Sequence, residues 1–257
     1  MSTAIVTLCD EGARLALRLA VKLGEARLFV HESAGECAEA ERFASVVELT
    51  AGIFSSYRRL VYIAPTGVVV RAIAPCLRHK LTDPAVVALD VGGRYAVSLL
   101  SGHEGGANAL ALQVANALGA EPVISTTTEA VRTLTVGIGC RRGTPAERII
   151  GAIREGLEKV GATLGEVRFL ASAELKADEP GLLQAARELG LGLRFISAGE
   201  ILSTTKRFRH SAFVAEKINL PAVAEPSALL AGRRTLLILP KTIINGVTVA
   251  VARENSL

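Results

Sequence analysis

A strand, a polar loop and a helix follow one another directly in Arg94-Tyr-Ala-Val-Ser-Leu-Leu-Ser-Gly-His-Glu-Gly-Gly-Ala-Asn-Ala-Leu-Ala-Leu-Gln-Val-Ala-Asn-Ala-Leu118. The run up to Leu100 predicts a strand, and the apolar residues 109–118 predict a helix. Glycines and polar residues fill the loop at 101–108. In open α/β sheets, ligands bind outside the carboxyl ends of strands. This stretch therefore indicates an α/β protein and a first candidate site.

Strands and helices are expected to alternate through the rest of the chain, with further buried strands at 60–64 and 134–139. Half of the 257 residues are apolar and only 4% are aromatic, so small aliphatic side chains must fill the core. That composition favours buried parallel strands covered by helices. We expect an α/β fold of two three-layer α/β/α domains with largely parallel or mixed sheets, at residues 1–130 and 131–257.

Local signals predict turns and helix ends. Gly92-Gly93 and Asn245-Gly246 are each expected to join two strands as hairpins. Thr144-Pro-Ala-Glu147 predicts a helix start with Thr144 as cap, proline in the first position and glutamate in the third. Residues 38–56 are expected to be largely helical.

Several protein classes are disfavoured by the sequence. No apolar run approaches the roughly 20 residues needed to span a bilayer, and residues 1–10 are expected to form a strand rather than a signal peptide. A cytoplasmic location is therefore expected. The four cysteines are scattered without metal-binding spacing, so a structural zinc site is not supported.

Charge differs between the two halves. Residues 1–130 carry 11 Lys and Arg against 13 Asp and Glu, whereas residues 131–257 carry 18 against 12. The basic second half would attract an anionic ligand. Its densest cluster, at 206–210, lacks a nucleic-acid-binding motif, so we expect a solvated surface or a polycarboxylate ligand rather than nucleic acid.

The loop at 101–108 carries the first candidate site. His103 exchanges a proton near neutral pH, and Glu104 would orient it or act as the base itself. The amides that begin the next helix favour anions. The alternative is a capped surface turn with a bystander histidine.

Three known chemistries are excluded by the motifs. Ala107 stands where the second histidine of HExxH would be, which excludes a zincin. GxSxG is absent around Ser101, and GxxxxGK[ST] occurs nowhere, which argues against an α/β-hydrolase and a P-loop nucleotide site.

A second candidate site is Gly137-Ile-Gly-Cys-Arg-Arg-Gly143, between a strand and a helix. Its spacing departs from the dinucleotide fingerprint GxGxxG, although Arg141 and Arg142 would suit an NADP phosphate. Anion binding by the two guanidinium groups and the helix amides is the broader expectation.

A third set of candidates lies at 71–90. Arg71, Arg78 and Lys80 would hold carboxylates, and Asp90 is expected to face the same loops at the end of a buried strand. Solvated helix charges are the alternative, and Lys176 is open to the same two interpretations.

Two sets of motifs resemble one known family. The first contains Gly67-Val-Val-Val-Arg71, the run Leu99–Asn108 and Pro122-Val-Ile-Ser-Thr-Thr-Thr128; the second contains Val136–Gly143 and Ser211-Ala-Phe-Val214. Both are similar to the cobalt-precorrin-5A hydrolase family of cobalamin biosynthesis. Family members usually carry a middle segment between the two sets, and here Thr128 and Val136 are nearly adjacent.

This resemblance implies a hydrolase that opens a lactone on a cobalt-bound ring and releases acetaldehyde, giving cobalt-precorrin-5B. The resemblance also implies that the cobalt belongs to the substrate, so that no cofactor and no metal held by the protein are expected. His103 would be the general base, oriented by Glu104 or Asp90, and the amides of residues 105–108 would stabilise the oxyanion. The substrate-binding residues would be Arg71, Lys80, Ser101, Gly102, Gly105, Gly106, Asn108, Gly139, Arg141, Arg142 and Lys176.

The substrate is expected to bind between the two domains, with no nucleic-acid or membrane partner; a homodimer is compatible with the sequence. The alternatives are a non-catalytic corrinoid-binding or delivery protein of the same pathway and an NADP-dependent reductase of a tetrapyrrole.

Overall fold

The computed structural model describes residues 2–210 and 220–255, which form two compact units. The units divide between Thr126 and Thr127, whereas the expected boundary lay between Ala130 and Val131. The family-like stretch Ser211–Val214 lies outside the described residues. Within the described ranges, no helix combines the length and hydropathy needed to cross a bilayer.

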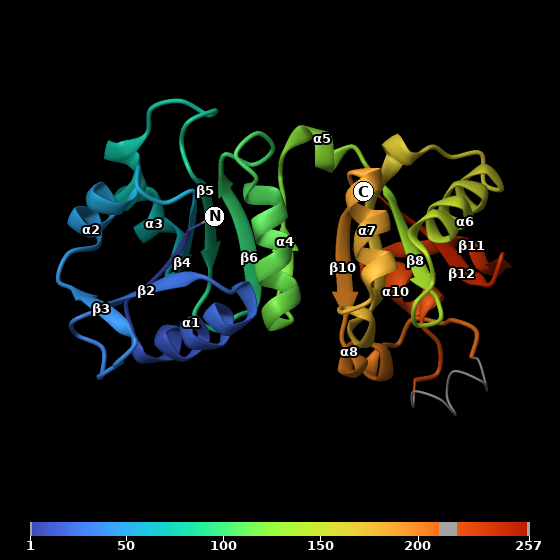
Figure 1. Ribbon diagram of the computed structural model, residues 1–257, viewed down its shortest axis with the longest axis horizontal. Coiled ribbons are helices and arrows are strands. Elements are labelled where there is room, and N and C mark those ends of the chain that lie inside the picture. The colour runs from blue at the N-terminus through green and yellow to red at the C-terminus, as the bar shows by residue number, and fades with distance from the viewer. Residues whose placement is uncertain (1, 211–219, 256–257) are drawn as a thin grey trace. The chain divides into compact units, whose positions relative to one another are not determined.

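The first unit is a seven-stranded sheet in the order β3-β2-β1-β4-β5-β6-β7 (Figure 1). Its strands and helices are β1 (Thr3–Thr7), α1 (Asp10–Leu23), β2 (Ala26–His31), β3 (Ala40–Phe43), α2 (Val46–Ile53), β4 (Arg59–Ile63), α3 (Thr66–Ile73), η1 (Ala74–Cys76), β5 (Ala85–Leu89), β6 (Tyr95–Leu100), α4 (Ala107–Leu118) and β7 (Glu121–Val123). The strands from β3 to β5 are mutually parallel, β6 is antiparallel to β5, and β7 is parallel to β6.

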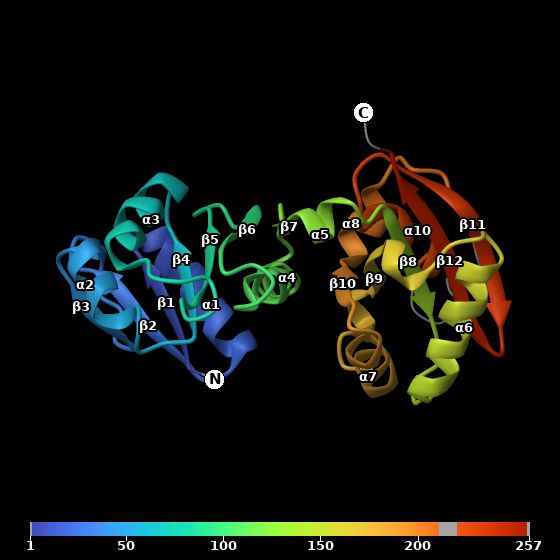
Figure 2. The ribbon, with the colours of Figure 1, turned by 90° about the horizontal axis from the view of Figure 1, so that it is seen from above.

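Helices cover both faces of this sheet, because strand side chains alternate between the faces. Leu60 and Tyr62 of β4 face α2 and α3, where they pack with Ile53, Val69 and Ile73. On the other face, α1 and α4 contact each other and the sheet (Figure 2). The unit therefore has the expected three layers.

The turn between β5 and β6 reverses the chain and decides where the later loops lie. The carboxylate of Asp90 accepts hydrogen bonds from the amides of Gly92, Arg94 and Tyr95 at 3.2, 2.8 and 2.8 Å. The predicted Gly92-Gly93 hairpin is confirmed. As a result, the C-terminal end of β6 lies beside the N-terminal end of β5, on the opposite side of the sheet from the C-terminal ends of β1 to β5.

The second unit is a five-stranded sheet in the order β10-β9-β8-β12-β11. Its elements are α5 (Thr127–Ala130), β8 (Leu134–Gly139), α6 (Ala146–Glu158), η2 (Leu164–Glu166), β9 (Val167–Ala173), η3 (Glu174–Lys176), α7 (Pro180–Leu189), β10 (Gly192–Ile196), α8 (Ala198–Ser203), α10 (Ala224–Leu230), β11 (Thr235–Ile244) and β12 (Val247–Glu254). Strands β8, β9 and β10 are parallel to one another. Strand β12 is antiparallel to β8, and β11 is antiparallel to β12.

This second sheet also lies between two helix layers. Val136 and Ile138 pack in one core cluster with residues of α6 and α7. On the other face, the hydroxyl of Thr135 donates to Ala228 O of α10 at 2.7 Å. A Cβ added to Gly137 would lie only 1.9 Å from Ala224 O, so α10 packs directly on the strand backbone. Mixed sheets in two α/β domains, as expected, are confirmed.

The hairpin predicted at Asn245-Gly246 is confirmed, with φ values of 50° and 80° at the two turn residues. Such a left-handed pair matches the twist of a two-residue hairpin. Strand β11 forms the edge of the sheet; it contains Pro240, and its pairing with β12 shifts register between Leu237 and Leu239 and again between Leu239 and Thr242.

Two local predictions are wrong. Residues 38–56 contain strand β3 before helix α2, because Ala40–Phe43 adds to the edge of the sheet beside β2. Thr144 does not cap α6, which begins at Ala146 with Pro145 as N-cap; the Thr144 hydroxyl instead donates to Arg141 O at 2.7 Å.

Replacing Gly137 with alanine is expected to lower the free energy of unfolding by at least about 2 kcal/mol, because the new methyl group would overlap backbone atoms of α10. Gly151→Ala is the matched control. Gly151 lies on the exposed side of α6 with open space around it, so this change should raise stability by about 0.5–1 kcal/mol. Urea unfolding followed by circular dichroism measures both. Equal stability of Gly137→Ala and the unmodified chain would contradict the packing described.

Candidate functional site

The loop at 101–106 is held in shape by its own first residues. Ser101 is buried and has a left-handed φ of 58°, which non-glycine residues rarely adopt. Its hydroxyl donates to Asp83 O at 3.1 Å, and its carbonyl accepts the amide of Ala107 at 3.1 Å. A Cβ on Gly105 would lie 2.3 Å from Ser101 Cβ. The loop therefore folds back tightly on Ser101.

Asn108 closes the other side of this loop. Its side-chain oxygen accepts from the hydroxyl of Ser98 at 2.8 Å, and its amide group donates to the hydroxyl of Thr126 at 3.0 Å. A Cβ on Gly102 would collide with both Thr126 and Asn108. Gly102, Gly105 and Asn108 were predicted to bind substrate; the structure places all three in contacts that shape the loop.

His103 and Glu104 are the exposed side chains at the tip of this loop. The carboxylate of Glu104 pairs with the Lys80 ammonium at 3.0 Å, which connects the loop to residues 77–84. A hydrogen bond from Lys80 is the main cause that lowers the pKa of Glu104. The ring of His103 has no hydrogen-bond partner among the described residues. Glu104 is thus engaged with Lys80 and does not hold the imidazole.

The expectation that Asp90 faces the same loop is wrong. Because β5 and β6 are antiparallel, Asp90 lies beyond one end of β5 and Ser101 lies beyond the other. Five strand residues separate the two ends, which corresponds to about 15 Å. Burial raises the pKa of Asp90, but hydrogen bonds from Tyr95 and Arg94 outweigh it, so the pKa is lowered overall. Asp90 organises the turn instead of orienting His103.

The predicted oxyanion donors are only partly available. Ala107 N donates to Ser101 O and Asn108 N donates to Gly102 O, at 3.1 and 2.9 Å. Within the part of the chain that the structure describes, the amides of Gly105 and Gly106 have no partner. Gly106 has a left-handed φ of 87° at the N-cap of α4. Of the four amides at 105–108 that were expected to bind an anion, only those of Gly105 and Gly106 are therefore free to do so among the described residues.

Arg71 projects from α3 in the same unit. It is exposed, and its guanidinium group donates to Gly67 O of its own helix at 3.2 Å. No carboxylate pairs with it within the described ranges. Its predicted role as a cation for a ligand carboxylate stays a prediction.

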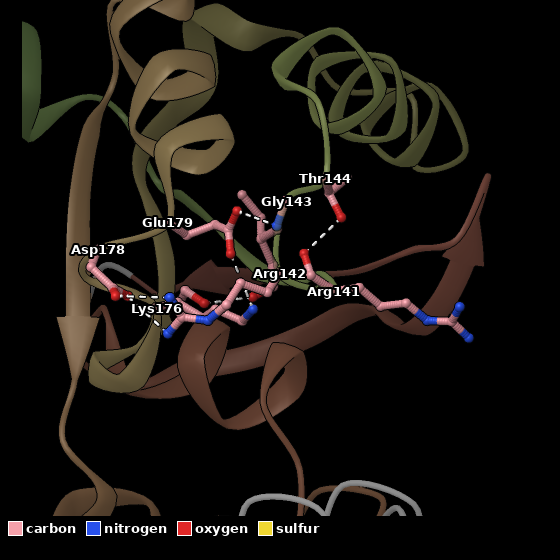
Figure 3. Close-up of polar contacts among 9 residues, drawn as sticks. Arg141, Arg142, Gly143, Thr144, Lys176, Asp178 and Glu179 are labelled. Carbon is pink, nitrogen blue, oxygen red and sulfur yellow. Dashed lines mark hydrogen bonds and ion pairs between the residues drawn. The ribbon is translucent and has the colours of Figure 1, made fainter.

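In the second unit, the loop at 139–143 joins β8 to α6 and contacts the segment that precedes α7 (Figure 3). The carboxylate of Glu179 accepts the amide of Gly143 at 2.8 Å and lies 3.4 Å from the Lys176 ammonium. Glu179 is fully buried, and the Lys176 side chain is only 12% exposed. Nearby, burial raises the pKa of the Cys140 thiol.

The two arginines of this loop differ in their surroundings. Arg142 forms two hydrogen bonds with Asp178, at 2.9 and 3.3 Å, and this pairing lowers the pKa of Asp178. Arg141 points away from that cluster (Figure 3) and has no side-chain partner among the residues described. Gly139 ends β8 and has room for a side chain beside Thr248.

The structure thus brings together His103, Glu104 and Lys80 in one unit, and Arg141, Arg142 and Lys176 in the other. That the two loops face each other stays a prediction. Sequence reasoning missed two groups that hold these loops, the backbone carbonyl of Asp83 and the carboxylate of Glu179. An acid directly before Pro180 at a helix start was the available signal for Glu179. In the described residues no group of three or more His, Cys, Asp and Glu side chains could hold a metal ion.

Two family models match this chain. The model described as Cobalamin synthesis G N-terminal matches residues 48–129, and the model described as Cobalamin synthesis G C-terminus matches residues 134–252. Together they include both loops described above.

Individual relatives agree with these matches. The chain is 28% identical to cobalt-precorrin-5A hydrolase of Priestia megaterium, covering 81% of this chain and 82% of the relative. It is 26% identical to cobalt-precorrin-5A hydrolase of Salmonella typhimurium, covering 72% and 79%. Among solved structures, CobE, a protein from the cobalamin (vitamin B12) biosynthetic pathway, is 31% identical over 49% of this chain and 92% of its own, with a TM-score of 0.46.

The Priestia alignment extends over 306 positions, more than the 257 residues of this chain. That relative therefore contains segments without a counterpart here. The two family models are separated by only residues 130–133 in this chain. Both observations agree with a short form that lacks a middle segment.

Replacing Lys80 with alanine is expected to raise the pKa of Glu104 toward its ordinary value, because the ammonium group that stabilises the carboxylate is lost. In the unmodified chain the ion pair is intact at neutral pH and is lost as the pH falls through the lowered pKa. An NMR titration of the Glu104 carboxyl carbon measures the shift. Lys22→Ala, in the last turn of α1, is the control and should leave it unchanged. An unaltered pKa in Lys80→Ala would contradict the pairing.

Proposed function

The chain belongs to the cobalamin synthesis G family, and from this premise we propose that it is a cobalt-precorrin-5A hydrolase. It acts on a cobalt-bound ring of anaerobic cobalamin biosynthesis, opens the ring lactone and releases acetaldehyde to give cobalt-precorrin-5B. The single observation that carries this proposal is the presence of both family regions on one chain, which aligns over most of its length with relatives of that name.

The loop at 101–106 offers what ester hydrolysis requires in one place. His103 is exposed and its ring is unpaired in the described structure, so it is available as a general base for a water molecule. The amides of Gly105 and Gly106, which follow it in the same loop, have no partner among the residues that the structure describes. Backbone amides of this kind stabilise the negative oxygen that forms when water adds to a lactone carbonyl, by about 3–4 kcal/mol for each donor.

The loop at 101–106 would carry the reaction in two stages, opening of the lactone and cleavage of a C–C bond. The imidazole of His103 takes a proton from water as the hydroxyl oxygen adds to the lactone carbonyl, and the carbonyl oxygen becomes negative. When the ring C–O bond breaks, the released oxygen receives that proton and an alcohol forms. Removal of the alcohol proton then lets this oxygen form the C=O bond of acetaldehyde as the adjacent C–C bond breaks, and the electron pair of the broken bond passes to the ring carbon, which takes up a proton.

The cationic side chains fit a substrate with several carboxylates. Arg71 and Lys80 lie in the first unit and Arg141 lies in the second, where Arg142 and Lys176 are paired with Asp178 and Glu179. Lys80 is held only by a solvent-exposed ion pair with Glu104, and such pairs contribute at most about 1 kcal/mol. A substrate carboxylate can therefore replace Glu104 at small cost. Nothing in this proposal requires a metal held by the protein, a nucleic acid, a membrane or a second copy of the chain.

Purified protein mixed with cobalt-precorrin-5A tests the activity directly. Hydrolysis predicts acetaldehyde release in proportion to the substrate consumed, measured with alcohol dehydrogenase and NADH. A change in the absorption spectrum without acetaldehyde would instead identify a corrinoid-binding or delivery protein, and the hydrolase proposal would be abandoned.

His103→Ala is expected to reduce acetaldehyde release by about 10²–10⁴-fold, the usual contribution of a general base. The control is His31→Ala in the same unit, whose ring is hydrogen-bonded to Ser33 and Ala44 at the opposite edge of the sheet. It should keep turnover within about threefold. Normal turnover by His103→Ala, with the melting temperature unchanged, would show that another group is the base.

A further inference from the structure

Two adjacent acids, Asp178 and Glu179, contact the loop at 139–143 in different ways (Figure 3). Asp178 is exposed and pairs with the exposed guanidinium group of Arg142. Glu179 is fully buried and binds the amide of Gly143, together with the ammonium of Lys176. The first contact neutralises a side chain, whereas the second fixes the path of the main chain.

Stability alone does not explain a fully buried carboxylate such as that of Glu179, because a buried ion pair often stabilises a protein no more than apolar side chains of similar size. The Glu179 carboxylate instead holds the backbone of the loop at 139–143. Gly143 has a left-handed φ of 76°, and its amide is held by Glu179. Thr144 donates from its hydroxyl to Arg141 O at 2.7 Å. The start of α7 packs against the same backbone, because a Cβ on Gly181 would lie 2.0 Å from Thr144 O.

These contacts fix the backbone of Arg141, whereas its side chain has no partner in the described ranges 2–210 and 220–255. The carbonyl of Arg141 is bound by Thr144, and two residues later the main chain is bound by Glu179. Its guanidinium group extends away from Lys176, Asp178 and Glu179 (Figure 3). Arg142, in contrast, would have to break a bidentate pairing with Asp178 before binding an anion, and such a pairing is stronger than the single bond between Lys80 and Glu104.

We propose that Arg141, and not Arg142, binds a carboxylate of the substrate, and that Glu179 is the positioning residue that holds the 139–143 loop so that Arg141 faces outward. This inference rests on the proposed function, because it takes the ligand to be a corrinoid with free carboxylate groups. In the loop at 139–143, Arg141 then binds the ligand, and Arg142 pairs with Asp178 at the protein surface.

The test is the dissociation constant of cobalt-precorrin-5A, measured by absorbance titration at a temperature where turnover is slow. Arg141→Ala should weaken binding by roughly tenfold to a hundredfold, the range for loss of a charge-assisted hydrogen bond. Arg141→Lys should recover part of the loss. Arg142→Ala is the matched control on the adjacent residue and should change binding by less than about threefold.

Glu179→Gln removes the charge that faces Lys176 while keeping an oxygen for the Gly143 amide. It should weaken binding by roughly tenfold, yet add less than about twofold when Arg141 is already alanine, because Glu179 acts through Arg141. A residue with a merely structural role would lower the melting temperature and have the same effect on binding in both backgrounds. The arginine variants keep the proposal testable if Glu179→Gln does not fold.

Equal losses for Arg141→Ala and Arg142→Ala, or a larger loss for Arg142→Ala, would overturn the assignment. So would full additivity of Glu179→Gln and Arg141→Ala. Failure of the proposed function is distinguishable, since the unmodified chain would then release no acetaldehyde, whether or not it binds cobalt-precorrin-5A. Binding without turnover leaves the test of Arg141 and Glu179 intact.

Discussion

Main-chain hydrogen bonding within tight loops is the constraint on which both candidate sites depend. A loop that folds close to its own backbone must satisfy its amides and carbonyls, because an unpaired buried polar group costs about as much as a lost hydrogen bond. In the 101–106 loop, Ser101 and Asn108 meet most of this demand. In the 139–143 loop, Glu179 and Thr144 do so. The groups left over at each loop are the ones available for chemistry.

This constraint explains why residues that stand next to one another have different roles. Ser101 and His103 are two residues apart, yet one is buried in hydrogen bonds and the other is exposed. Arg141 and Arg142 are neighbours, and within the described part of the chain only Arg142 has an acid as its partner. A motif such as LLSGHEGGAN therefore combines residues that build a loop with residues that the loop presents, and the sequence alone does not separate them.

Local patterns were sufficient to predict much of the fold. The strand and helix on either side of the 101–108 loop, and the turn at Asn245-Gly246, depend on residues that lie close together in the chain.

Strand β3 was missed because Ala40–Phe43 is a short, charged edge strand without an apolar pattern. The bond between Glu179 and Gly143 joins residues 36 positions apart, so no local rule would reveal it. Asp90 lies far from the 101–106 loop because the hairpin at Gly92-Gly93 makes β6 antiparallel to β5.

The outermost strand of the second sheet has a consequence for self-association. A long, regular edge strand is a template on which another chain can add by backbone pairing. In β11, Pro240 lacks an amide hydrogen, and two register shifts bend the strand away from regular geometry. Although Leu236 and Ile243 are exposed on this strand, the edge is poorly suited to extending the sheet into a neighbouring molecule. These irregularities protect the protein against fibre-like aggregation at that edge.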